Sequence, residues 1–368
     1  MENKVFQFSP DYTIHPGEYI DELLDVYGMK QTELALRLGI TTKHLNNLIS
    51  GKVSVTPEMA QGLQQVFQRT AKYWLLLQAN YDLSIQKEKR REWFEVHKEE
   101  CRKWLELFDY PMLVKQKYLK KNTSDDFERV EELLHFFGCA DIASWNQMYC
   151  SELPAACRIT GGAGARIGNT SSWLRQGQLI AQNAPVEMPM YDRRKFRQTL
   201  AEIRNLTLSE ENFVPILKHL CEQAGVRLLL VRELPKSGIS GAAFWIRNGE
   251  IPCIQMNLRY KKNDHFWFIF YHEAAHIVKE HKKYIFIDCE KREESDIEKE
   301  ADKMAGNWLI PENDYLKFVK RNSFYEEDIV RFSSEIHIHP GVVVGRLQHD
   351  GKIPWSWHNR LKQSLEWE

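Results

Sequence analysis

The sequence lacks a disulfide framework and any long apolar run. Its seven cysteines are odd in number and scattered, and no two of them form a C-x-x-C pair. This usage is typical of free thiols in a reducing compartment and argues against a small secreted scaffold. The longest apolar run, Phe266 to Tyr271, is far shorter than the ~20 residues that a membrane-spanning helix needs. We therefore expect a protein that does not enter membranes.

The chain also has almost no net charge and no recognisable targeting segment. The formal net charge of −1 creates no global field that would attract nucleic acid or lipid, so any nucleic-acid surface must be local. The N-terminal residues contain no apolar segment of the kind found in signal peptides, and we expect a cytoplasmic location. With 368 residues, of which 43% are hydrophobic and 27% charged, the composition is that of a globular protein with two or three domains.

Residues 1–83 carry the pattern of a small helical domain. Gly39 lies in a short turn, and Thr41 can N-cap the helix that follows it. Helix, short turn with glycine, helix is the helix-turn-helix plan. Helices are predicted over residues 16–27, 31–38, 42–49 and 58–67, and a fifth carries Trp74.

In that plan the third helix enters the major groove of double-stranded DNA. Asparagine amides can contact adenine, and lysine can contact guanine or phosphate. Between residues 30 and 52 the basic residues face a single acid, Glu33, as expected for a groove-binding surface. The alternative is a small helical bundle that contacts another protein. The candidate DNA-contact residues are Gln31, Thr42, Lys43, Asn46 and Asn47.

Residues 84–189 are predicted to form a helical middle region. The basic cluster from Lys87 to Arg91 either extends a DNA-contact surface or forms a solvated helix face. The glycine-rich stretch from Thr160 to Gly168 is not followed by G-K-[ST], so we expect a loop or a helix start and not a phosphate loop. Helices are expected over 86–107, 125–137 and 173–181 here, and over 193–204 and 211–224 beyond it, the last N-capped by residues 207–209.

The periodicity changes after residue 225. Short apolar segments at 226–231, 241–247 and 252–257 predict three strands, and Asn248-Gly249 is a strong hairpin-turn signal. An edge strand of such a sheet can pair with an extended peptide. The next segment is apolar almost all round from residue 266, which predicts a buried helix that begins near Asp264. The tail is expected to add helices at 326–334 and 341–347.

That buried helix contains His272-Glu273-Ala274-Ala275-His276, an H-E-x-x-H motif. Histidines four residues apart lie on one helix face and can bind one Zn²⁺ ion. In a core these polar side chains would be costly without partners, and a metal supplies them. Glu273 can act as the general base that takes a proton from water whose pKa is lowered toward about 7. The alternative is a pair of core histidines bonded to the backbone.

Zinc needs a third protein ligand, and Glu298 is the best candidate. It lies at the edge of an apolar stripe on a helix that starts after Ser295. Asp302, one turn later, could accept the N–H of a ligand histidine. The competing interpretation is that Ser295 and Glu298 form an S-x-x-E capping box. The remaining ligand candidates are His281, whose spacing from His276 is unsuitable, Asp288, expected on a loop, and Glu300, which points away from the stripe.

Candidate residues also exist for an oxyanion-stabilising group and for a second metal site. Tyr271 and His281 are the nearest candidates for stabilising an oxyanion. His337 and His339 alternate along the chain and share a side, so a second metal site is conceivable. A hydrogen-bonded loop is the simpler interpretation of that pair.

The two ends of the chain resemble two known families. Residues 12–80, with HPGEYIDELL, MKQTELALRLGI and NNLISGK, resemble HigA-type antitoxins of the lambda-repressor-like (XRE) class, which implies operator binding as a homodimer. Residues 190–360, with HEAAH, EKEADKMA and WLIP, resemble the ImmA/IrrE metallopeptidases. That resemblance implies zinc on His272, His276 and Glu298, Glu273 as general base, and a regulatory protein as the substrate.

The expected fold is mainly α. An all-α helix-turn-helix domain (1–83) and a helical middle region (84–189) precede an α+β zincin-like domain of the gluzincin type (190–368). The expected function is a DNA-binding transcriptional regulator carrying a zinc-dependent endopeptidase that cleaves a repressor or a toxin–antitoxin partner. The alternative is an antitoxin-like repressor whose zinc domain senses or binds a partner without proteolysis.

Overall fold

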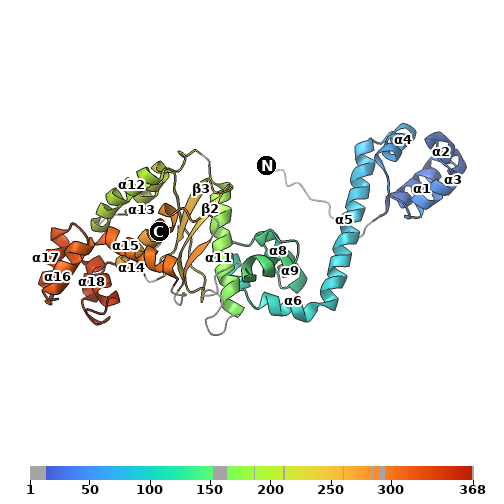
Figure 1. Cartoon of the computed structure of the whole chain (residues 1–368). Coiled ribbons are helices and arrows are strands. Elements are labelled where there is room, and N and C mark those ends of the chain that lie inside the picture. Colours follow the sequence, from blue (N-terminus) through green and yellow to red (C-terminus); the bar gives the residue numbers. More distant parts are fainter. Residues whose placement is uncertain are drawn as a thin grey trace, which may run out of the picture. The chain divides into compact units, whose positions relative to one another are not determined.

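The computed structural model describes residues 14–151, 164–185, 187–209, 212–259, 261–282, 285–289 and 295–366. The chain divides into two compact units, Met1–Lys98 and Glu99–Glu368, which are described separately (Figure 1). The fold is mainly helical with one small sheet, as the sequence predicts. Among the described residues, no helix combines the length and apolarity needed to cross a membrane.

The N-terminal unit is a helical bundle around an apolar core. Its helices are α1 (Pro16–Tyr27), α2 (Gln31–Leu38), α3 (Thr42–Ile49), α4 (Pro57–Phe67) and α5 (Ala71–Val96). The side chains of Ile20, Leu34, Leu45 and Trp74 are fully buried between them. Gly39 closes α2 in the left-handed region, and Thr41 Oγ1 accepts the N–H of His44 at 3.2 Å. The predicted helix-turn-helix is therefore present as α2, the turn and α3.

Helix α5 corrects the prediction for the residues that follow. It continues to Val96, so the expected fifth helix and the first part of the expected charged helix are one element. No glycine or proline interrupts residues 71–96. A break at His97 separates α5 from α6 (Lys98–Leu105). The expected domain boundary between residues 83 and 84 lies inside α5, so that division stays a prediction about independent folding.

The helices after residue 98 belong to the C-terminal unit, and the last of those named here, α11, packs against its sheet. They are α7 (Tyr110–Lys115), α8 (Asp126–Phe137), α9 (Ile142–Trp145), a π-helix (Asn146–Ser151) and α11 (Gly164–Asn183). Trp173 of α11 donates its indole N–H to the carbonyl of Val231 at 3.0 Å, and its own carbonyl accepts from Gln255 Nε2 at 2.7 Å. Of the glycine-rich stretch, residues 164–168 begin α11, and 160–163 lie outside the described residues.

A four-stranded sheet of order β1-β3-β2-β4 forms the centre of this unit. The strands are β1 (Arg227–Leu230), β2 (Ile239–Ile246), β3 (Ile251–Met256) and β4 (Phe286–Cys289). β2 and β3 form the predicted antiparallel hairpin, and β1 pairs parallel to β3. The edge strand β4, which pairs antiparallel to β2, was not predicted and contains Asp288, so the expected loop at this residue is wrong.

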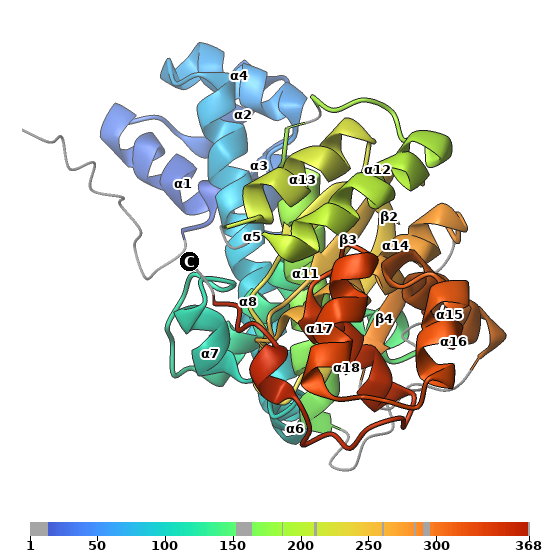
Figure 2. The same ribbon diagram turned by 90° about the vertical axis from the view of Figure 1, so that its left-hand side faces the viewer.

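Helices cover both faces of this sheet (Figures 1 and 2). α11 lies on one face, and α14 (Asn263–Val278) lies on the other, where α15 (Asp296–Leu309) packs against it. The apolar side chains of α14, including Trp267 and Phe270, are buried as predicted. The remaining elements are α12 (Arg193–Asn205), a 3-10 turn (Leu206–Leu208), α13 (Val214–Gln223), α16 (Glu312–Lys320), α17 (Glu326–Glu335), α18 (Pro340–His349) and a 3-10 turn (Asn359–Leu361).

Two expected helix starts are wrong. α13 begins at Val214, whose N–H is accepted by Asn212 Oδ1 at 3.1 Å, whereas the Thr207 hydroxyl donates back to the carbonyl of Arg204 at 2.9 Å. α14 begins at Asn263, because the Asp264 carboxylate pairs with Lys362 Nζ at 2.6 Å and not with a backbone N–H.

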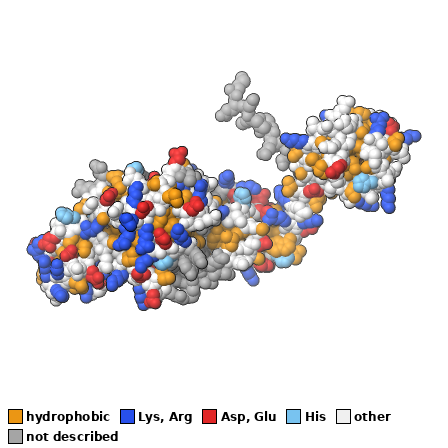
Figure 3. Space-filling model, turned by 45° about the horizontal axis from the view of Figure 1, so that its top comes forward, with side chains coloured by type: hydrophobic (Ala, Val, Ile, Leu, Met, Phe, Trp, Pro, Cys, Tyr) orange, Lys and Arg blue, Asp and Glu red, His pale blue; other side chains and the backbone are white. Residues whose placement is uncertain are grey.

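The surface carries charges of both signs, and Lys and Arg side chains gather on one face of the C-terminal unit (Figure 3).

Candidate metal centre and helix-turn-helix surface

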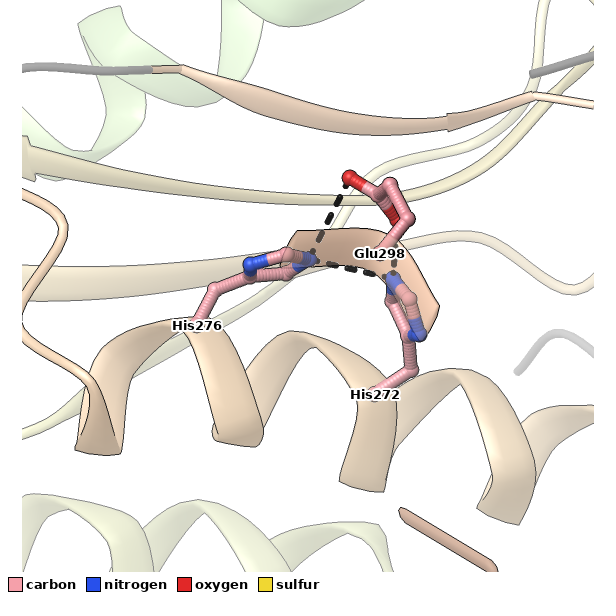
Figure 4. Close-up of side chains that lie close together, drawn as sticks. All are labelled: His272, His276 and Glu298. Atoms are coloured by element: carbon pink, nitrogen blue, oxygen red, sulfur yellow. Dashed lines mark hydrogen bonds and ion pairs between the residues drawn. The ribbon is translucent and has the colours of Figure 1, made fainter. Parts of the chain in front are cut away.

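Helix α14 places His272, Glu273 and His276 in the interior of the C-terminal unit. Their exposed fractions are 1%, 0% and 1%. Because the histidines are four residues apart, their rings leave the same side of the helix and approach each other, with the two Nε2 atoms 3.1 Å apart (Figure 4). The expected one-face arrangement of the motif is therefore present.

Glu298 reaches the two histidines from the first turn of α15 (Figure 4). Its carboxylate oxygens lie 3.1 Å from His272 Nε2 and 3.6 Å from His276 Nε2. Three ligands at ordinary zinc bond lengths in a tetrahedron would lie roughly 3.3 Å from one another. The donor set, two imidazole nitrogens and one carboxylate oxygen within 4.8 Å, therefore fits a small divalent cation.

The competing capping interpretation of Glu298 is compatible with this geometry. Ser295 Oγ accepts the backbone N–H of Glu298 at 3.2 Å and so caps α15. The Glu298 carboxylate meanwhile faces the histidines, so the serine fixes the start of the helix and leaves the acid available to the site.

Asp302 lies one turn after Glu298 and contacts the far side of a histidine ring. Its Oδ1 is 2.9 Å from His272 Nδ1. A carboxylate in this position favours the tautomer with a proton on Nδ1 and leaves the Nε2 lone pair directed at the cluster. The contact has the geometry that the expected supporting role requires, and the role itself stays a prediction.

The cluster is polarised by burial and by its own members. Burial lowers the pKa of His276, and hydrogen bonding to Glu298 opposes this effect. Burial alone would raise the pKa of Glu298, but its contacts with His272 and His276 hold that pKa well below its usual range. The Glu298 carboxylate is therefore ionised, which is the state that metal ligation requires of it.

Glu273 faces strand β2 at Gly241. A Cβ atom at Gly241 would lie 2.6 Å from Glu273 Oε1 and 2.6 Å from Ile269 Cγ2, so only glycine leaves room for this carboxylate. Sequence reasoning missed Gly241, because its role depends on α14 packing across β2. A glycine within an otherwise apolar strand was the one available signal.

The remaining candidates are not part of the three-ligand cluster. Glu300 pairs with Lys279, as its outward direction predicts. The Tyr271 hydroxyl donates to the Leu200 carbonyl at 2.8 Å inside the core, which removes Tyr271 as an oxyanion donor. The His281 ring centroid is 6.0 Å from that of His276, and the Asp288 side chain lies outside the described residues.

The paired histidines of the tail do not form a metal cluster among the described residues. His339 Nδ1 accepts the N–H of Gly341 at 3.0 Å and caps α18. His337 occupies the left-handed turn after α17. The hydrogen-bonded loop is therefore the correct alternative for this pair.

Helix α3 presents the expected polar face in the N-terminal unit. Its apolar residues Leu45 and Leu48 are buried against the bundle. Of the candidate DNA-contact residues, Thr42, Lys43 and Asn46 are exposed, whereas Asn47 and Gln31 are half-buried. The Gln31 amide donates to Asp21 Oδ1 at 3.3 Å, so it must exchange this partner before it contacts another acceptor.

Comparison with known proteins assigns a class to each end of the chain. Residues 22–74 match the family model of helix-turn-helix domains, and residues 266–322 match that of peptidase U49. The second match contains the H-E-x-x-H helix, Glu298 and Asp302.

Individual relatives match the helix-turn-helix class. Virulence-associated protein A' of Dichelobacter nodosus is 41% identical over 71 residues, which cover 19% of this chain and 62% of that protein. The HTH-type transcriptional regulator YddM of Escherichia coli, described as uncharacterized, is 35% identical over 69 residues, or 19% of this chain and 73% of the relative. A solved addiction module antidote protein of the HigA family from Coxiella burnetii is 34% identical with a TM-score of 0.21, covering 22% of this chain and 90% of that one.

The chain belongs, through its N-terminal domain, to the family of helix-turn-helix transcriptional regulators. It joins this domain to a segment, residues 266–322, that matches the peptidase U49 model, and the two matches confirm the fusion that the sequence resemblances predict. The chain spans less than two thirds of the first relative's length, 62%.

Proposed function

We propose that the chain is a DNA-binding transcriptional regulator whose C-terminal domain is a zinc-dependent endopeptidase. The observation that supports the peptidase most strongly is the convergence of two histidine nitrogens and a glutamate carboxylate within 4.8 Å, inside the segment that matches peptidase U49. The proposed substrate is a regulatory protein, either a repressor or a toxin–antitoxin partner.

His272, His276 and Glu298 would hold the zinc ion. When bound, Zn²⁺ supplies a Lewis acid that polarises a peptide carbonyl and makes water more acidic. Asp302 keeps the His272 ring in place by accepting its Nδ1–H at 2.9 Å. The three ligands and their support thus come from two packed helices, which is the rigid placement that catalysis requires.

Glu273 is the proposed general base. It precedes Ala274 and Ala275 on the same buried helix and lies beside both histidines without joining the ligand set. Its carboxylate takes the proton of the attacking water and transfers it to the nitrogen of the departing amine, so that the peptide C–N bond breaks without releasing a free amide anion. Burial beside Gly241 excludes bulk water from this carboxylate.

Replacing Glu273 with Gln separates this proposal from the alternative of a repressor whose zinc domain only senses or binds a partner. The variant keeps the size of the side chain and the three ligands but lacks the base. We expect metal binding to persist while cleavage of a quenched-fluorescent peptide library falls by about 10²–10⁴-fold. Cleavage at the wild-type rate would refute the proton-transfer role, and absence of cleavage by the wild-type chain in every metal-loaded state would favour the sensor.

For the N-terminal domain we propose that α3 is the recognition helix and that the chain binds its operator as a homodimer. Thr42, Lys43, Asn46 and Asn47 would face the major groove, with Gln31 near the backbone or a base edge. Two-fold symmetry would match two half-sites about one helical turn apart. Light scattering of the chain with and without a promoter fragment tests the dimer.

A matched pair of double variants tests the recognition helix. Asn46→Ala with Asn47→Ala removes two amides from α3, and Gln61→Ala with Gln65→Ala removes two exposed amides from α4. If α3 reads the bases, only the first pair weakens binding to a fragment of the chain's own promoter, by roughly tenfold or more for each lost bidentate contact. Equal affinity of the two pairs would contradict the assignment.

A further inference from the structure

A cavity of about 470 Å³ lies between α14, α15, α18 and the C-terminal segment. Its volume is in the range of sites that hold small molecules. Its apolar lining comes from residues far apart in the sequence, namely Phe268, Leu309, Ile310, Val342 and Trp355. The lining does not include Glu273 or the three proposed metal ligands, so this cavity is separate from the proposed catalytic site.

Two glycines make room for the charged side chains that line this cavity. A Cβ at Gly345 would lie 2.7 Å from Asp264 Oδ2, and a Cβ at Gly306 would lie 1.9 Å from an Arg346 guanidinium nitrogen. α18 can therefore approach α14 closely, and the Arg346 guanidinium can lie against α15 and over the Tyr315 ring, 4.9 Å from its centroid. The close packing of α14, α15 and α18 thus fixes the positions of the Asp264 and Arg346 side chains, which form part of the polar wall of the cavity.

Most charges on this wall are neutralised by a partner. Lys362 Nζ pairs with Asp264 Oδ2 at 2.6 Å, and only 9% and 12% of these side chains are exposed. Arg346 Nε pairs with Asp350 Oδ2 at 2.8 Å. Because Lys362 and Arg346 are already paired with carboxylates, neither of them is the main attraction for an ionic ligand.

Lys262 is different. Its ammonium donates to Ser364 Oγ at 2.9 Å and forms no ion pair among the residues that the structure describes. Lys262 is half-buried and lies at the edge of the cavity next to the first turn of α14. Among the lysines and arginines that line the described part of the cavity, Lys262 is thus the one without a carboxylate partner, and a ligand with one anionic group would supply it.

We propose that this cavity binds a small apolar monocarboxylate, with its carboxylate on Lys262 and its hydrocarbon part against Phe268 and Val342. The Phe268 ring that such an occupant contacts also faces His272, with ring centroids 6.3 Å apart. The site therefore lies one aromatic ring away from the metal cluster. This inference stands independently of the proposed peptidase function.

Calorimetric titration of the full-length chain with decanoate, 1-decanol and decylamine tests the proposal, because the three probes share a chain and differ in head-group charge. We expect the wild type to bind decanoate about tenfold more tightly than decanol, the ratio that one charge-assisted hydrogen bond supplies. Lys262→Met keeps the apolar stem and should bind both probes equally. Lys262→Glu should reverse the preference in favour of decylamine.

Lys261→Glu is the matched control. Lys261 is exposed and adjacent in sequence, but it does not line the cavity. This variant makes the same change in net charge and should retain the wild-type preference. Three outcomes would each overturn the proposal. Decanoate binding could be unaltered in Lys262→Glu, or decanoate affinity could fall equally in both glutamate variants. The third is that the folded wild type shows no saturable binding of decanoate. Circular dichroism confirms that each variant is folded.

Discussion

Gly241→Ala is the sharpest structural test of how the base is held. Among the described atoms, a Cβ added to Gly241 would lie 2.6 Å from Glu273 Oε1, whereas ordinary contacts begin at 3.4 Å. The carboxylate or the strand must therefore shift by about 0.8 Å, and a misplacement of about 1 Å in a reacting group can cost about 10²-fold in rate. That factor corresponds to about 2.7 kcal/mol in the activation barrier.

The assay compares initial rates of peptide-library cleavage by metal-loaded protein, with metal content measured on the same samples. Because the atoms nearest to the added Cβ belong to Glu273 and Ile269 and not to a proposed ligand, the alanine variant should retain its metal and lose rate. Ala242→Gly changes the next residue, whose side chain lies on the other face of the strand, and controls for disturbance of β2. Wild-type rates in Gly241→Ala would refute the role given to Glu273, and loss of metal would refute the separation of base from ligands.

Three further tests address the support of the site, the packing of α1 against α3, and two helix caps. Asp302→Asn should weaken zinc affinity about 10–100-fold in a chelator competition, since His272 loses its carboxylate partner; unchanged affinity would count against this contact. Gly17→Ala would bring a Cβ to 2.3 Å from a carbonyl oxygen at the end of α3, so the N-terminal unit alone should unfold at a lower temperature. His15 and His339 each accept a backbone N–H on Nδ1, at 2.9 and 3.0 Å, and burial lowers the pKa of both. Because the folded pKa is lowered, the stability that the two neutral histidine caps contribute is complete above about pH 6.5 and is lost as the pH falls through the folded pKa. The Tm of the chain should therefore drop between about pH 7.5 and 5.5. A variant with Asn at both caps should show a smaller drop.

The sequence predicts the parts of the fold that depend on local chemistry. The helix-turn-helix is marked by Gly39 and by the Thr41 cap, and the hairpin by Asn248-Gly249, all within a few residues of the structure they determine. The continuity of α5 and the start of α13 were missed because patterns and caps locate helices better than they locate their ends. β4 is four residues long and pairs with a strand far before it, so no local signal marks it.

The candidate site divides in the same way. His272 and His276 share a helix, and their spacing alone predicts their proximity. Glu298 and Asp302 could be proposed from the apolar stripe of their helix, but the sequence left the capping interpretation open until the packing of α15 on α14 was known. Gly241 and the cavity lined by Lys262 depend entirely on tertiary packing.

The central claim is that the C-terminal domain is a metal-dependent peptidase with Glu273 as its base. One time course tests it most directly: mass spectrometry of a peptide library incubated with wild type and with Glu273→Gln, each carrying one equivalent of zinc. We expect new internal cleavage products with the wild type, and a rate about 10²–10⁴-fold lower with the variant. The same products at the same rate from both proteins would contradict it.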